Sequence, residues 1–175
     1  AAHNNRDNAL KEMGRYKEAQ GEFKQALEAA RTLESDLLQA RILTNLASSQ
    51  LLAGDLAEAD ATARQGLRIS ARSAVGWEPY LWGVRAQIAL AQQDLATART
   101  YIERTFAGVE LDSSTMPYRE FHETARRIYS ELGDANTASR HTTAFRRLDD
   151  QGRRIPAATS AALVPGGMEM AQLRR

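Results

Sequence analysis

The chain has 175 residues, with 23 Lys and Arg against 22 Asp and Glu, and it contains no cysteine. The lack of thiols excludes disulfides, a cysteine nucleophile and cysteine-based zinc or iron-sulfur sites, and a net charge of +1 does not favour binding to nucleic acid. No apolar run approaches the length of about 18 residues that a membrane-spanning helix needs, so we expect no membrane span.

Helical patterning runs along most of the chain. Alanine dominates, and apolar residues recur at helical spacing, as in Leu38, Ile42 and Leu46. Val, Ile and aromatic residues do not alternate at a period of two over any length that would indicate a strand. The sequence therefore predicts an all-α fold.

Four short segments of similar sequence interrupt this pattern, and each is typical of a tight turn between two helices. A glycine, or Gln93 in the third segment, stands where a helix would end in the left-handed conformation. An aspartate that can cap the next helix follows in three of them. The segments are residues 12–19, 52–59, 91–98 and 131–138, and they align on Ala19, Ala59, Ala98 and Ala138, at spacings of 40, 39 and 40 residues. This period predicts eight helices in four antiparallel pairs, with the first turn at Gly14.

The turn segments resemble the tetratricopeptide repeat. The first two repeats supply the matching residues Gly14, Tyr16, Ala19, Phe23 and Ala26, then Leu46, Ala47, Gly54, Ala59 and Ala63. The last two supply Trp82, Ala86 and Ala98, then Tyr129, Gly133, Ala138 and Phe145. The resemblance covers about residues 5–150 and implies a right-handed α-solenoid of about four antiparallel helix pairs, with repeats at about residues 1–34, 36–72, 76–108 and 116–150.

The interval between the turns is longer than the usual unit of about 34 residues. Either the helices are longer or the connections between repeats are extended. A long interval is similar to that of the repeats in bacterial regulators, including transcription activators and sensor enzymes. We therefore place the chain in a bacterial regulatory or signalling protein.

Both ends of the chain differ from the repeats between them. The start lacks an initiator Met and the features of a signal peptide, so we interpret the chain as a segment of a larger protein, and we favour the cytoplasm over the periplasm. Residues 151–175 are predicted to form a capping helix, at residues 157–164, and a flexible tail.

Few residues offer reaction chemistry. His122 and His141 lie on the two helices of one repeat, where we expect neighbouring polar surface residues. Arg126 stands where a zinc-protease helix starting at His122 would need its second histidine. Glu123 precedes Arg127 by four residues, the spacing of a solvated ion pair. We find no nucleophile elbow and no phosphate-binding loop, and we predict no metal, no cofactor and no enzyme activity.

The resemblance also implies where a partner binds, because the first helices of successive repeats line the concave face of such solenoids. Counting back from each turn places six polar candidates there: Arg41, Asn45, Ser48, Tyr80, Gln87 and Arg127. The leading hypothesis is a non-catalytic module that binds a protein or peptide. The alternative is an oligomerisation spacer, forming a homo-oligomer within a transcription regulator or a sensor enzyme such as a diguanylate cyclase or kinase.

Overall fold

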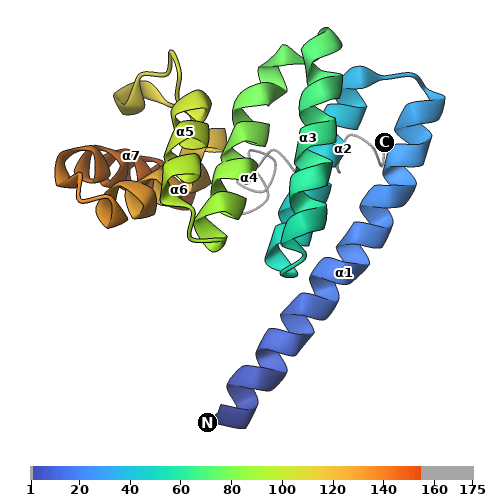
Figure 1. Cartoon of the computed structure of the whole chain (residues 1–175), viewed down its shortest axis with the longest axis horizontal. Coiled ribbons are helices and arrows are strands. Elements are labelled where there is room, and N and C mark those ends of the chain that lie inside the picture. Colours follow the sequence, from blue (N-terminus) through green and yellow to red (C-terminus); the bar gives the residue numbers. More distant parts are fainter. Residues whose placement is uncertain (1, 155–175) are drawn as a thin grey trace. The chain divides into compact units, whose positions relative to one another are not determined.

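The computed structural model describes residues 2–154, with side chains from Glu12 onward. This part of the chain is all-α and contains no strand (Figure 1). Its seven α-helices are α1 (Ala2–Thr32), α2 (Asp36–Leu52), α3 (Leu56–Ser73), α4 (Glu78–Ala91), α5 (Leu95–Thr105), α6 (Arg119–Glu131) and α7 (Ala135–Arg154). Three single 3-10 turns join them, at η1 (Val75–Trp77), η2 (Leu111–Ser113) and η3 (Met116–Tyr118). None of these helices combines the length and the apolar character needed to cross a bilayer.

Helix α1 corrects one prediction, because it passes through Gly14 without a break. A helix end needs more than a glycine. The predicted turns at residues 54, 93 and 133 are each followed by an aspartate, whereas Gly14 is followed by Arg15, which cannot cap a new helix through a side-chain acceptor. The helix therefore continues for 31 residues, and the number of helices between residues 2 and 154 is seven instead of eight.

The other predicted turns end their helices in the same way. At the end of α4, the N–H of Gln93 donates to Leu90 O over 3.0 Å and the N–H of Asp94 donates to Ala89 O over 2.9 Å. This pair of bonds is a Schellman motif, which satisfies carbonyls that a helix end leaves open. The residue at the turn has a positive φ in each of four motifs: Glu34 (52°), Gly54 (86°), Gln93 (61°) and Gly133 (82°).

The residue after each of these turns begins the next helix. Ser35 accepts a hydrogen bond from the N–H of Leu38, and Asp94 and Asp134 accept from the N–H groups three residues further on. Asp55 differs, since its side chain makes no cap bond and instead accepts from Lys17 Nζ of α1 over 3.0 Å. That ion pair connects the turn between α2 and α3 to α1.

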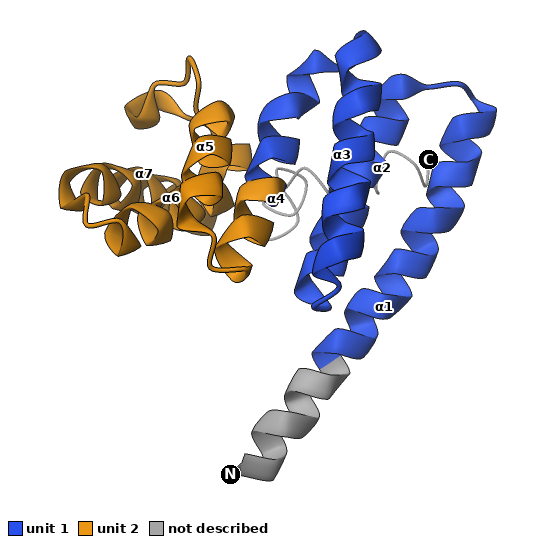
Figure 2. Cartoon of the chain, in the orientation of Figure 1, with its two compact units in different colours: residues 1–84 blue, residues 85–175 orange. Residues whose placement is uncertain are grey.

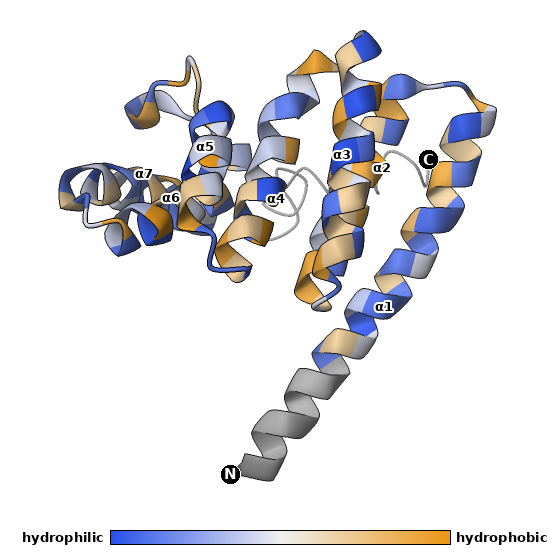
Figure 3. Ribbon diagram, viewed as in Figure 1, coloured by the Kyte–Doolittle hydropathy of each residue, from blue (hydrophilic) through white to orange (hydrophobic). Residues whose placement is uncertain are grey.

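Two compact units make up the chain, Ala1–Val84 and Arg85–Arg175 (Figure 2). In the first unit, α2 packs against both α1 and α3. The shared core contains Leu27 and Ala30 of α1, Ile42 and Leu43 of α2, and Ile69 of α3. Most of the visible side of α1 is hydrophilic, which fits a helix that contributes only one stripe to this core (Figure 3).

In the second unit, α6 packs against α7 and α5. Ile102 of α5, Ile128 of α6 and Leu148 of α7 are fully buried. Of the four aligned alanines, Ala59, Ala98 and Ala138 are buried, whereas Ala19 in α1 is half-buried. An extended connection, residues 106–118, joins α5 to α6 and contains η2 and η3.

The predicted capping helix at residues 157–164 lies outside the described residues. Helix α7 itself continues to Arg154, four residues past the predicted end of the last repeat. The right-handed course of the solenoid stays a prediction.

Candidate functional site

Three of the predicted contact residues share one stripe of α2. Arg41, Asn45 and Ser48 are half-buried and follow one another at spacings of four and three residues, so they lie on the same face of the helix. Leu37 and Leu52 extend this stripe at its two ends and are largely exposed, at 43% and 56%. We call these five residues the α2 stripe. It is a polar surface flanked by two apolar positions.

Arg41 and Tyr80 are joined through an aromatic side chain. The Arg41 guanidinium lies over the Trp77 ring, 5.7 Å from its centroid, and Trp77 meets Tyr80 edge to face at 5.4 Å. Cation–π and edge-to-face contacts of this kind hold side chains in a defined orientation. Trp77 therefore packs between α2 and the start of α4, and this packing orders the predicted site residues Arg41 and Tyr80.

Gln87 makes an internal contact. Its Nε2 donates to Thr124 Oγ1 over 3.2 Å, which links α4 to α6 within the second unit. The Thr124 hydroxyl in turn donates to Glu120 O. A side chain that bridges two helices in this way positions them, and its amide is already engaged.

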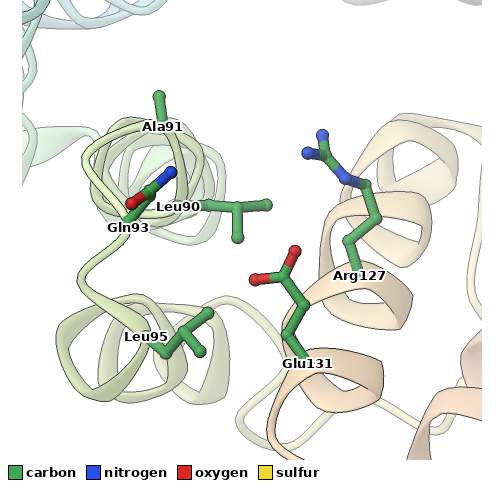
Figure 4. A pocket seen from close by; sticks show the side chains of 6 residues that line it. All are labelled: Leu90, Ala91, Gln93, Leu95, Arg127 and Glu131. Atoms are coloured by element: carbon green, nitrogen blue, oxygen red, sulfur yellow. The ribbon is translucent and has the colours of Figure 1, made fainter.

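Arg127 lies at a pocket in the second unit, with a volume of about 480 Å³. The pocket is lined by Leu90, Ala91, Gln93, Leu95, Arg127 and Glu131, from the end of α4, the start of α5 and one face of α6. Figure 4 shows the Arg127 guanidinium and the Glu131 carboxylate extending from α6 toward the space in front of Leu90. The pocket thus combines apolar walls with one group of each charge.

The ion pair predicted between Glu123 and Arg127 is wrong. Glu123 instead binds Arg126, through Nη2 over 2.6 Å and Nε over 2.9 Å. Two N–H groups of the Arg126 guanidinium bind the two oxygens of the Glu123 carboxylate. Such a bidentate contact is stronger than the single bond that Arg127 would make. Within residues 12–154, the Arg127 guanidinium has no ion-pair partner, although Arg127 and Glu131 are neighbours on α6.

His122 and His141 lie close together as predicted, but they are buried instead of on the surface. Their Nδ1 atoms are 2.9 Å apart, and their side chains are 0% and 4% exposed. Ser114 Oγ lies 2.7 Å from His122 Nε2, and Arg147 Nη2 donates to the same hydroxyl over 3.2 Å. The four side chains form one buried polar network, and Phe106 covers both rings with its centroid 4.7 Å from each.

Burial makes both histidines poor bases. It lowers the pKa of His122 to about 3, together with the positive charges of a protonated His141 and of Arg147. It lowers the pKa of His141 to about 4, and the charge of Arg140 contributes. Both rings are therefore neutral near pH 7, so one Nδ1 can carry a hydrogen and the other can accept it.

Ser114 and His122 are residue types that can form a nucleophile and its base, but their environment does not suit catalysis. The hydroxyl also donates to Leu111 O over 2.8 Å and is 5% exposed, so no substrate reaches it. Among the described residues, no group of three or more potential metal ligands comes together.

Residues 1–72 match the family model of the tetratricopeptide repeat. Over these residues the chain is similar to tetratricopeptide repeats. Repeats of this family mediate protein–protein interactions and are typically non-catalytic. No curated protein and no solved structure matches the chain. The recognition of the family from its turn residues is thus confirmed over α1, α2 and most of α3, and the α2 stripe lies inside the matched residues.

The tetratricopeptide pattern led to Arg127 but not to the rest of the pocket or to the histidine network. Leu90 and Leu95 looked like ordinary core residues in the sequence. The histidines carried a signal, since residues 19 apart on paired helices face each other. Ser114 carried none, because it belongs to a connection whose path only the folded chain defines.

Proposed function

We propose that the chain is a non-catalytic docking module that binds a segment of a partner protein, at the α2 stripe in the first unit and at the Arg127 pocket in the second. The tetratricopeptide match supports the general role, and the pocket carries the specific proposal. Its guanidinium has no ion-pair partner within residues 12–154, so binding a carboxylate there would break no existing pair. The long spacing of the turns supports a place in a bacterial regulatory or signalling protein.

The chemistry of the pocket defines what its occupant offers. Leu90 and Leu95 provide an apolar wall for one aliphatic or aromatic side chain. Arg127 favours an acidic group on one side of that anchor, and Glu131 favours a basic group or an N–H donor on the other. The occupant is a peptide segment with an apolar residue flanked by one acidic and one basic residue.

Peptide selection tests this proposal. The full chain, immobilised, is panned against a displayed library of random 12-residue peptides, and the Kd of enriched peptides is measured by isothermal titration. We expect the apolar anchor with flanking charges to be enriched. Arg127→Glu should raise Kd about tenfold or more, because a charge-assisted bond becomes a repulsion.

Arg146→Glu is the matched control. Arg146 is exposed on α7 of the same unit and does not line the pocket, so the substitution makes the same charge change elsewhere. Equal losses in the two variants would show a general charge effect and contradict the pocket assignment. Ser48→Glu tests the α2 stripe in the same assay. Concentration-dependent self-association of the wild type in ultracentrifugation, with no enriched peptide, would favour the oligomerisation spacer instead.

A further inference from the structure

The connection between α5 and α6 is held by a small number of buried polar contacts. Arg147 Nη2 of α7 donates to Ser114 O over 2.8 Å and to Leu111 O over 3.2 Å. Ser114, itself buried, binds His122 of α6, and Phe106 at the start of the connection lies against both histidine rings. Residues 106–118 are therefore tied to α7 directly by the Arg147 bonds to their backbone, and to the histidine pair by the Ser114–His122 bond and the Phe106 ring.

The bond between the two rings depends on the number of protons. With both rings neutral, one Nδ1 carries a hydrogen and the other accepts it across 2.9 Å. One added proton is tolerated, since a single hydrogen still lies between the two nitrogens. A second added proton places a hydrogen on both Nδ1 atoms, so two N–H donors and two positive charges face each other at this distance. The bond is then lost and the rings repel.

The surroundings offer nothing to compensate those charges. The charged groups that influence the pair are Arg147 and Arg140, both on α7 and both positive. The remaining neighbours are aromatic or neutral: Phe106, Ser114 and Tyr118 from the connection, and Tyr129, which stacks on His141 from α6. No carboxylate contributes to the electrostatics of either histidine among the described residues.

We propose that the His122–His141 pair is an acid-sensitive latch: protonation of both rings releases residues 106–118 from α6 and α7 while these helices stay folded. The connection moves first because two of its contacts, the Ser114–His122 bond and the Phe106 ring against both histidines, depend on the pair. Helices α6 and α7 also pack through apolar residues such as Ala125, Ile128 and Leu148, whose contacts do not titrate. A hydrogen bond between two neutral rings is lost when both rings become charged.

Hydrogen exchange with mass spectrometry on the full chain tests the latch. Protection factors for peptides covering residues 106–118 are compared with those for α6, α7 and α2 at pH 7.5, 6.0, 5.0 and 4.5, each corrected for the intrinsic exchange rate at that pH. We expect protection of the connection to fall at least tenfold between pH 7.5 and 4.5, because released histidine rings take up protons near their ordinary pKa of 6.5 whereas the paired rings resist protonation. Protection of α6 and α7 also falls as acid lowers the free energy of unfolding, but it should stay at least tenfold above that of the connection at each pH.

Two variants identify the groups responsible. His141→Phe keeps an aromatic ring between Phe106 and Tyr129 but cannot be protonated, so the acid response of the connection should largely disappear. Ser114→Ala keeps both histidines but removes the hydrogen bond between His122 and the connection. Protection of residues 106–118 should then be lower than in the wild type already at pH 7.5.

Three results would overturn the latch. The first is constant protection of the connection down to pH 4.5. The second is equal protection of α6, α7 and the connection at each acidic pH, which would mean that all three exchange only when the whole unit unfolds. The third is an unchanged acid response in His141→Phe or wild-type protection at pH 7.5 in Ser114→Ala. Each readout is independent of partner binding, so a failure of the docking proposal does not affect it.

Discussion

Gly66 of α3 lies against Leu81 of α4. A Cβ built on this glycine would lie 2.7 Å from Leu81 Cδ2 of α4 and 3.4 Å from Leu43 Cβ of α2. Leu81 is completely buried, so it has little room to retreat. The glycine is therefore retained for space and not for a turn, since it lies within a regular helix.

Gly66→Ala should destabilise the chain by about 1–3 kcal/mol, the usual cost of forcing a methyl group into a packed core. The measurement is urea unfolding followed by far-UV circular dichroism. Gly21→Ala is the matched control, because Gly21 lies on the exposed side of α1 with no atom within 4 Å of the added methyl. It should stabilise α1 by about 1 kcal/mol through helix propensity. A stabilising effect at Gly66 would contradict the close packing.

At the scale of elements, the turn after α4 has a glutamine in the left-handed conformation, whereas the turns after α2 and α6 have a glycine there. Gln93 has a φ of 61°, against 86° for Gly54 and 82° for Gly133. A residue with a Cβ pays about 1–2 kcal/mol for the left-handed conformation. The same Schellman bonds form in all three turns, so the geometry is imposed by the helix pair and not by glycine alone.

Gln93→Gly should therefore raise the free energy of unfolding by about 1 kcal/mol, as measured by thermal or urea denaturation. Gln92→Gly serves as the comparison, because the neighbouring residue does not have a positive φ. There glycine only adds conformational entropy to the unfolded chain, and stability should fall by about 0.5–1 kcal/mol. Effects of the same sign at both positions would show that backbone strain at residue 93 is not the cause.

The extended connection is the element that most distinguishes the second unit. Between the turns at Gly54 and Gln93, the chain uses an α3 of 18 residues and a short link through η1. Between Gln93 and Gly133 it uses an α5 of only 11 residues followed by residues 106–118. Two intervals of nearly equal length are thus filled in different ways, and only the second provides the anchor for the buried histidines.

For the whole molecule, the histidine network predicts a dependence of stability on pH. The folded-state pKa values of about 3 and about 4 lie below the unfolded value of 6.5. The unfolded chain therefore binds more protons at acidic pH, and stability is fully present above pH 6.5 and declines below it. Carboxylates with lowered pKa values, such as Asp149 beside Arg119, lose their contribution only near or below their unfolded value of 3.8.

Between pH 7 and pH 5, the free energy of unfolding should fall by about 2 kcal/mol or more, because unfolding lets the coupled histidine pair take up protons. Urea titrations at the two pH values measure this difference. The double variant His122→Leu, His141→Phe should show a clearly smaller difference. If wild type and double variant depend equally on pH over this range, the histidines are not the groups that titrate.

The sequence by itself determined the all-α class, the tetratricopeptide character of residues 1–72 and the turns at Gly54, Gln93 and Gly133. These features depend on signals within a few residues: a left-handed position, a cap and a small residue that allows close packing. The prediction of a turn at Gly14 was wrong because it relied on such a local signal. A glycine is compatible with a turn but does not impose one.

Only the tertiary structure decided what the side chains do. Arg127 lines a pocket because Glu123 binds Arg126 instead, and Gln87 is engaged because Thr124 of another helix faces it. Phe106 covers the buried histidines, and Ser114 from the same connection bonds one of them. Each outcome depends on which partners the folded chain brings within reach, whether they lie three residues apart like Glu123 and Arg126 or 37 apart like Gln87 and Thr124.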